Sequence, residues 1–127
     1  MQPPRRINYR RNSRTLMLEF ADATFELPAE LLRVYSPSAE VRGHGDGDRK
    51  LQTGKKYVAI TSIEAVGNYA IRITFDDGHD TGLYGWDFLH DLGRRETEYW
   101  TDYEREMKAA NASRLPTIAV GKWTPKL

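Results

Sequence analysis

The sequence contains no cysteine among its 127 residues, and it lacks both a long apolar run and a large charge imbalance. The absence of thiols excludes disulfides, thiolate ligation of metals or iron–sulfur clusters, and a cysteine nucleophile. The formal net charge is +1, so no overall field attracts nucleic acid or an anionic membrane. No apolar run approaches the roughly 20 residues that cross a bilayer, and the N-terminus carries no hydrophobic signal segment. We therefore expect a cytoplasmic protein with no membrane partner.

The length suits a single domain, and the two ends differ in composition from the middle. Residues 1–13 combine two prolines with four arginines and show no apolar period, which predicts a flexible basic arm. Residues 14–110 carry the apolar periodicity of one domain. Residues 111–127 contain two prolines and a glycine and predict an extended C-terminal tail. Its apolar residues Ile118, Val120 and Trp123 are candidates for docking on the body or on a neighbour.

Alternating apolar residues predict two antiparallel units. Residues 15–20 and 23–27 alternate on either side of a turn, which is typical of a β-hairpin with one apolar face. Residues 57–66, 69–75 and 79–83 predict a three-stranded meander whose turns contain glycine. We expect one core to be shared by Leu16, Leu18, Ile71, Ile73, Phe75 and Trp86.

Helical spacing dominates the region that follows the meander. Apolar residues from Trp86 onward predict an amphipathic helix that Gly93 interrupts, and an aromatic stripe then continues from Tyr99 to Ala110. A short helix is expected over 28–34 and a short strand over 39–42, while the glycine-rich residues 43–50 read as a flexible loop. The predicted fold class is therefore α+β: a mostly antiparallel sheet of two hairpin units, with a C-terminal helical region packed on it.

The three histidines, His44, His79 and His90, are the candidates for chemistry. His79 follows the acidic turn Asp76-Asp77-Gly78, and it is followed by Asp80, so it is a candidate metal ligand. The competing interpretation is that these aspartates serve the turn by accepting backbone N–H bonds, and this is the one that turn chemistry favours. No serine sits on a nucleophile elbow. We therefore expect no catalytic and no cofactor-binding residues.

Two segments carry a resemblance to a known family. LPAELLRVYSPSAEVRGHG and IEAVGNYAIRITFDDGHDTGLYGWDFLHDLG resemble the small bacterial proteins of the DUF971 family, which are similar to the N-terminal domain of gamma-butyrobetaine hydroxylase. The likeness covers roughly residues 14–93, so it identifies 14–110 as a DUF971-like domain. In the hydroxylases, as the resemblance implies, this domain precedes an iron- and 2-oxoglutarate-dependent catalytic domain. That catalytic domain has no counterpart in the sequence, so the resemblance implies no hydroxylase activity.

The resemblance also implies a position for a structural zinc. In the hydroxylase domain the metal is held by three cysteines and one histidine, and these positions fall here on Ser36, Ser38, Val41 and His79. Three of the four ligands are thus replaced by residues that bind zinc poorly or not at all. The sequence predicts folding without metal, with His79 as the remaining candidate ligand.

Three functions follow from these observations. The leading hypothesis is a non-catalytic accessory or interaction domain whose partner is another protein. The second is a metal-binding accessory protein using His79 and nearby carboxylates, with His44 as a further candidate ligand. The resemblance implies a link to iron or iron–sulfur metabolism, because related domains resemble parts fused to iron–sulfur carrier proteins. The third, which the net charge disfavours, is a weak nucleic-acid binder that uses the arginines of the arm, Arg5, Arg6, Arg10 and Arg11.

Overall fold

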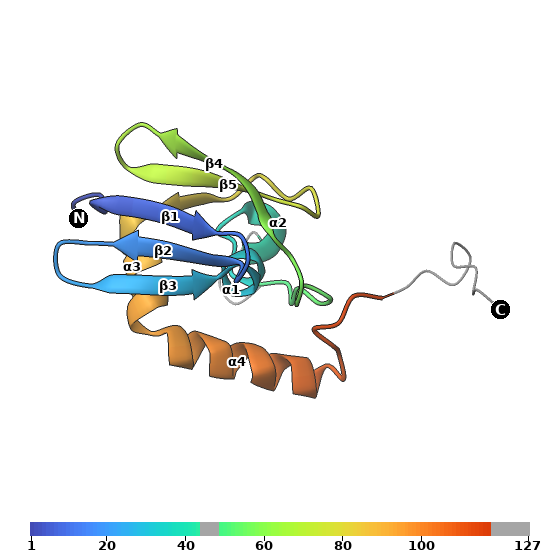
Figure 1. The fold of residues 1–127 in the computed structure, drawn as a ribbon. Helices are drawn as coiled ribbons and strands as arrows, with labels where there is room; N and C mark the ends of the chain where they lie inside the picture. The colour runs from blue at the N-terminus through green and yellow to red at the C-terminus, as the bar shows by residue number, and fades with distance from the viewer. Residues whose placement is uncertain (44–48, 118–127) are drawn as a thin grey trace.

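The computed structural model describes residues 1–43 and 49–117, which form two three-stranded antiparallel sheets and four helices (Figure 1). The first sheet contains β1 (Arg6–Arg10), β2 (Thr15–Glu19) and β3 (Thr24–Pro28), and the second contains β4 (Ile60–Val66), β5 (Ala70–Phe75) and β6 (Leu83–Gly85). The helices are α1 (Ala29–Val34), α2 (Ala39–Arg42), α3 (Trp86–Arg94) and α4 (Glu96–Ala109). The α+β class is confirmed, with the antiparallel strands divided between two sheets.

The predicted flexible arm is wrong for residues 6–10, because they form β1. This strand pairs with β2 in the register Ile7 with Leu18 and Tyr9 with Leu16. Ile7 and Tyr9 are partly buried against the core, while Arg6, Asn8 and Arg10 are exposed. Alternation was present in the sequence, but with only two apolar residues in five it was hidden by the arginines.

The meander of the second sheet is confirmed, with shifted boundaries. β4 begins at Ile60 rather than at residue 57, and the returning strand β6 covers 83–85 rather than 79–83. Tyr69 lies in the β4–β5 turn and is 60% exposed, so the buried face of β5 starts after it. The turn needs Gly67, whose φ of 54° lies in the left-handed region that favours glycine.

Helical boundaries differ from the prediction at two places. Gly93 does not interrupt the helix that begins at Trp86. α3 continues through Gly93 to Arg94, and the break falls at Arg95. A Cβ at Gly93 would lie 2.2 Å from Cγ of Phe25, so this glycine permits close packing of α3 on β3. The predicted strand over 39–42 is wrong, since these residues form α2. Within the described residues, no helix is long and apolar enough to span a bilayer.

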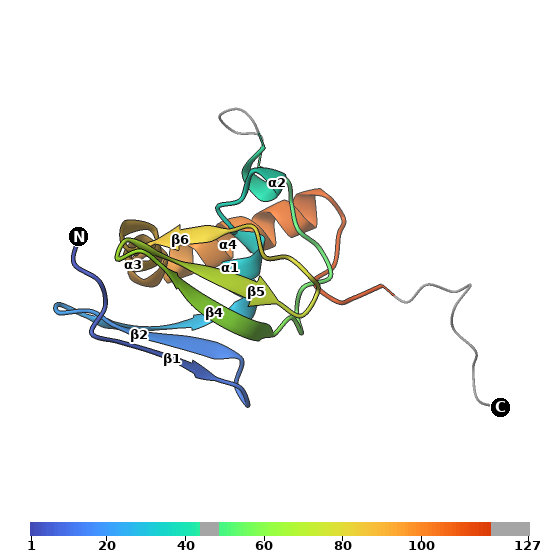
Figure 2. The same cartoon turned by 90° about the horizontal axis from the view of Figure 1, so that it is seen from above.

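One core cluster joins both sheets to the helices. Figures 1 and 2 place α1, α3 and α4 on one side of the first sheet, and the second sheet closes over them. The six residues predicted to share a core are all buried in this cluster: Leu16, Leu18, Ile71, Ile73, Phe75 and Trp86. From the aromatic stripe of α4, Tyr103 and Met107 are buried, whereas Ala110 is exposed.

Residues beyond the predicted domain boundary fold back on the body. The N–H of Gly54 donates to the carbonyl of Ser113 over 3.0 Å, and the N–H of Lys56 donates to that of Arg114 over 2.9 Å. The expected tail is therefore anchored at least through Arg114. The proposed docking of Ile118, Val120 and Trp123 lies outside the described residues.

Candidate functional site

A tight turn after β5 positions His79. Gly78, at a φ of 90°, closes the turn with its N–H donating to the carbonyl of Phe75 over 3.0 Å. The N–H of His79 donates to Oδ1 of Asp77 over 3.1 Å, and its carbonyl accepts the N–H of Phe75 over 2.9 Å. Backbone hydrogen bonds on both sides thus fix the direction in which the imidazole points.

Asp77 is the charge centre beside this turn. Its Oδ2 accepts from Nε of Arg33 at 2.8 Å and from Nζ of Lys55 at 2.5 Å. Desolvation raises the pKa of the Asp77 carboxyl, but hydrogen bonds from Lys55, the His79 N–H and Arg33 outweigh it and lower the pKa to about 2. Asp77 therefore serves the turn and two cations, as turn chemistry predicted. Asp76 accepts a backbone N–H outside the turn, since its Oδ1 lies 3.1 Å from the nitrogen of Ala59.

The imidazole of His79 enters a buried polar cluster. Its Nε2 lies 2.8 Å from Oγ of Ser36 and 3.4 Å from Oγ of Ser38, while its Nδ1 lies 3.3 Å from Oε2 of Glu40. His79 is only 8% exposed, Ser38 4% and Ser36 0%. The structure therefore brings three of the four positions implied by the resemblance into one hydrogen-bonded cluster.

The protonation state of His79 follows from its surroundings. Burial lowers the pKa of His79, the positive charge of Arg33 lowers it further, and the carboxylates of Glu40 and Asp77 oppose the shift without reversing it. The imidazole is therefore neutral at neutral pH. A neutral ring donates from one nitrogen and accepts at the other. The contacts are satisfied when Nδ1–H donates to Glu40 and Nε2 accepts the Ser36 hydroxyl proton.

Residues that the sequence did not single out complete this cluster. Glu40, on α2, orients the imidazole ring of His79. The sequence signal that could have identified it was an acidic residue four positions after Ser36. Gly82 packs closely against Ser36, and a side chain at this position would not fit, since a Cβ there would lie 2.5 Å from the Ser36 Oγ. Val41 is 1% exposed on α2, so this position contributes apolar packing.

The donor set does not fit the zinc that the resemblance implies. Two neutral hydroxyls and the side chain of Val41 stand at the three cysteine positions, and zinc sites in proteins use thiolates, imidazoles or carboxylates. Among residues 1–43 and 49–117, no three histidine, cysteine or acidic side chains are placed to hold a metal ion together. Asp80 is exposed, and His44 lies outside the described residues.

The order of groups from Ser36 through His79 to Glu40 is that of a nucleophile, a base and an orienting carboxylate. Such a relay works only when the serine oxygen reaches a substrate carbonyl. Ser36 has no exposed surface, and Gly82 packs directly on its hydroxyl. The cluster therefore holds α2 and the chain before it against the β5 turn, and it offers no nucleophile to a substrate.

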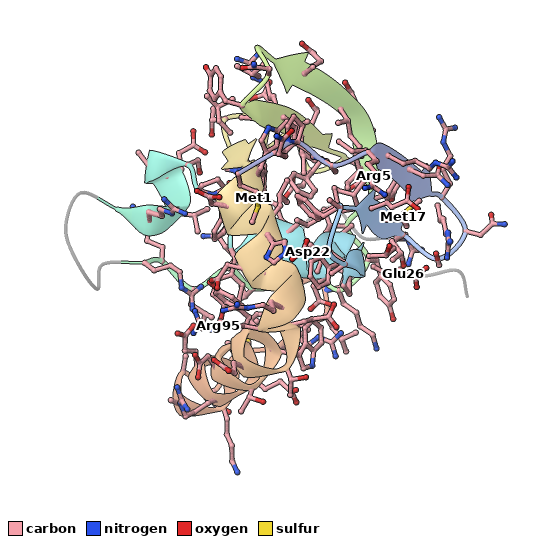
Figure 3. All side chains as sticks on the ribbon, turned by 90° about the vertical axis from the view of Figure 1, so that its left-hand side faces the viewer. Met1, Arg5, Met17, Asp22, Glu26 and Arg95 are labelled. Atoms are coloured by element: carbon pink, nitrogen blue, oxygen red, sulfur yellow. The ribbon has the colours of Figure 1, made fainter. Side chains whose placement is uncertain are left out.

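His90 has a separate structural role. Its Nε2 lies 3.0 Å from Oδ2 of Asp22, at the tip of the β2–β3 hairpin, and the rings of Phe20 and Phe25 pack edge-on against the imidazole. Figure 3 shows Asp22 beside α3, on the face turned toward the viewer. His90 thus ties the hairpin to α3.

Arginines of the predicted basic arm alternate with acidic side chains on the first sheet. Arg10 forms an ion pair with Glu26, and Arg6 lies opposite Glu19 across the β1–β2 ladder. The labelled Glu26 and Arg5 in Figure 3 show both charge signs on this sheet. This interleaving does not make the continuous basic stripe that phosphate tracking requires.

An open hollow separates the end of β1 from the start of β4. It is lined by Tyr9 of β1, by Arg11 of the β1–β2 turn and by residues 60–63 of β4. The N–H of Ile60 donates to the hydroxyl of Tyr9 over 3.0 Å, which is a side-chain contact between two edge strands. Each sheet therefore ends here without a neighbouring strand.

The fold is that of a small α+β domain, in which a buried serine–histidine cluster joins α2 to the turn after β5. Residues 7–90 match the family described as gamma-butyrobetaine hydroxylase-like, N-terminal, and the chain belongs to this family. The resemblance inferred from the sequence is confirmed.

Solved structures agree with this assignment. Two NMR solution structures are similar over nearly the whole chain: one is 44% identical with a TM-score of 0.81, covering 98% of this chain and 99% of its own. The other is 45% identical with a TM-score of 0.78, covering 99% and 95%. A crystal structure from Acidithiobacillus ferrooxidans, described as a protein of unknown function in the DUF971 family, is 34% identical with a TM-score of 0.60, covering 71% and 91%. No curated protein matches the chain.

Proposed function

We propose that this chain is a non-catalytic domain that acts by binding another protein. The observation that carries the proposal is that the serine–histidine cluster, the group of side chains that most resembles a catalytic site, is buried. Ser36 is 0% exposed and His79 8%, so neither reaches a substrate. By contrast, β1 and β4 present unpaired edges to solvent in the described part of the chain. Edges of this kind recognise other chains through backbone hydrogen bonds.

The other two hypotheses receive less support. A metal-binding role through His79 is opposed by the donor set around it, because hydroxyls and an aliphatic group cannot replace thiolates. A link to iron or iron–sulfur metabolism rests on the resemblance alone. Nucleic-acid binding is opposed by the acidic partners of the first-sheet arginines, such as Glu26 beside Arg10.

The experiment measures partner binding and catalytic turnover for both the wild type and Ser36→Ala. The full chain is used to capture a protein from cells that express it, and the complex is then rebuilt from purified components. We expect a complex of fixed stoichiometry that survives Ser36→Ala, since the hydroxyl is buried away from any partner. The proposal fails if purified wild type turns over a substrate and folded Ser36→Ala does not.

A further inference from the structure

β4 offers an open backbone edge. It pairs with β5 alone, and it stands at the end of the strand order β4-β5-β6. The N–H of Phe75 donates to the carbonyl of His79, on the side of β5 that faces β6. Because successive residues of an antiparallel strand turn their backbone groups to opposite sides, the odd-numbered residues of β5 all face β6. Their partners in β4, Ile63 and Ala65, therefore point their N–H and C=O groups to the open edge.

The beginning of this edge is polar and irregular. A register shift between Ile60 and Ser62 bends β4 there, and the hollow that Arg11 helps to line begins at the same place. Further along, Ile63 is half-buried and Ala65 is exposed. The residues whose backbone groups point outward, Ile63 and Ala65, thus offer an apolar and a small side chain to an added strand, and there is open space at the start of the edge.

Positive charge gathers at the same end. The guanidinium of Arg14 lies 5.8 Å from the ring centre of Tyr57, and the Lys56 ammonium lies 5.5 Å from it, while the ring is 50% exposed. Arg14 adopts a left-handed φ of 53°, which few residues other than glycine adopt, so the hairpin end is held in an unusual conformation. Arg11, Arg14 and Lys56 form no ion pair with any described residue.

Other charges also lie near β4. Lys55 is paired with Asp77, and Glu64 lies opposite Arg72 across the β4–β5 ladder, although these two side chains form no ion pair in the described residues. Asp76 also lies near the start of β4, but it faces the backbone of Ala59. The three unpaired cations therefore give this end of the edge a local positive field in a chain whose net charge is only +1.

We propose that β4 binds an extended acidic segment of a partner protein as an added strand. The segment pairs with the outward groups of Ile63 and Ala65, and its carboxylates lie against Arg11, Arg14 and Lys56. This rests on the proposed interaction function and names the surface and the partner chemistry. A row of alternating N–H and C=O groups fits a peptide backbone, whereas a phosphate chain offers no donors to match the carbonyls. A second copy of this chain would bring to the edge a β4 whose acidic residue already faces Arg72.

The probe is a synthetic peptide of about eight residues, the length of an ordinary strand, with alternating threonine and valine and two glutamates at one end. It is titrated into the full chain while backbone amides are followed by NMR. We expect downfield shifts and slowed hydrogen exchange at Ile63 and Ala65. The Glu64 amide faces β5 already and should change little. Binding should weaken by about tenfold when salt is raised from low to several hundred millimolar.

Matched controls separate charge from backbone pairing. A glutamine version of the peptide should bind about tenfold more weakly. Of the two versions N-methylated at alternate residues, the one that blocks the N–H groups facing β4 should not bind, because it loses its donors. The double variant Arg11→Glu/Lys56→Glu should also lose binding, whereas Arg94→Glu, an exposed arginine on α3, should retain it.

Three outcomes would overturn the assignment of β4. The first is that Ile63 and Ala65 do not respond to the glutamate peptide, and the second is that a lysine version binds equally well. The third is that these amides are already protected in the free chain because it self-associates. A partner captured by the chain that still binds Arg11→Glu/Lys56→Glu would refute β4 as the site while leaving the interaction function intact. Absence of any protein partner would refute both.

Discussion

Arg114 forms a bidentate ion pair with Glu30. Its Nε donates to Oε2 and its Nη2 to Oε1, each over 2.7 Å, and the hydroxyl of Tyr103 donates to Oε2 at 2.8 Å. The Glu30 side chain is only 6% exposed, on the helix that follows β3. This fork-shaped pair ties the segment after α4 to α1, 84 residues earlier in the chain.

Replacing Arg114 by methionine should therefore destabilise the domain. The substitution leaves a buried carboxylate with the Tyr103 hydroxyl as its remaining described partner. We expect a loss of about 1–3 kcal/mol, reduced from a fully buried pair because the Arg114 side chain is 35% exposed. Urea denaturation at unchanged m-value measures it. Arg105→Met, which breaks an exposed pair with Asp102, should cost less than about 0.5 kcal/mol; equal losses would contradict the role of Glu30.

Gly93→Ala tests the contact between α3 and β3. In an open helix this change would stabilise by roughly 0.5–1 kcal/mol, because alanine restricts the unfolded chain. Here the new Cβ would meet the Phe25 ring at 2.2 Å, so we expect a net loss of about 1–3 kcal/mol. Adding Phe25→Leu should recover part of the loss, since the two sites are in contact. A more stable Gly93→Ala protein would show that the ring moves aside freely.

The strands and the core were readable because they follow simple periods. Alternation around Leu16 and Leu18, and again around Ile71 and Ile73, predicted both hairpins and their buried faces. Apolar side chains at every second position lie on one face only if the segment is a strand. β1 escaped detection because Ile7 and Tyr9 are its only apolar residues.

The cluster around His79 was only partly predictable. The resemblance pointed to Ser36, Ser38 and His79. His79 lies 43 and 41 residues after the two serines, so it meets them only through tertiary packing. The acidic charge of Glu40 close to Ser36 was the one local sign of its role, and nothing local revealed that Gly82 packs on the Ser36 hydroxyl. The break at Arg95 was missed for a related reason, because Gly93 is placed by its contact with Phe25 and not by helix propensity.

Stability should fall below neutral pH through His79. Its folded pKa is lowered from 6.5, so the unfolded chain binds the proton more readily. The contribution of neutral His79 is therefore complete above pH 6.5 and is lost as the pH falls from there toward the lower folded value. Denaturant midpoints measured from pH 8 to pH 5 should decline for wild type, and His79→Gln should remove this part of the decline.

Two comparisons isolate that effect. His90→Gln, at the other buried imidazole, should leave the His79 part of the decline in place. Asp77 acts in a separate window: its pKa is lowered from 3.8 to about 2, so its contribution is present above pH 3.8 and is lost between there and pH 2. If His79→Gln keeps the full decline between pH 6.5 and pH 5, burial of His79 is not its source.

The last prediction concerns metal. A structural zinc supplies its binding energy directly to folding, so its removal unfolds a domain that depends on it. Here hydrogen bonds among Ser36, Ser38 and His79, with the packing of buried Val41, occupy the positions of the ligands. We therefore expect the thermal midpoint of the wild-type chain to be unchanged by a strong zinc chelator, and elemental analysis to find far less than one metal per chain.

The triple variant Ser36→Cys/Ser38→Cys/Val41→Cys is the matched control, because it places thiolates at the three positions where the resemblance implies the zinc ligands. We expect this variant to bind zinc and to melt at a lower temperature when chelator is added, which shows that the assay detects a metal-dependent fold. His79→Gln in the triple-variant background should weaken zinc binding, since it removes the fourth ligand. Wild type that loses stability in chelator and carries near-stoichiometric zinc or iron would contradict the prediction, and it would make His79 a metal ligand in this chain.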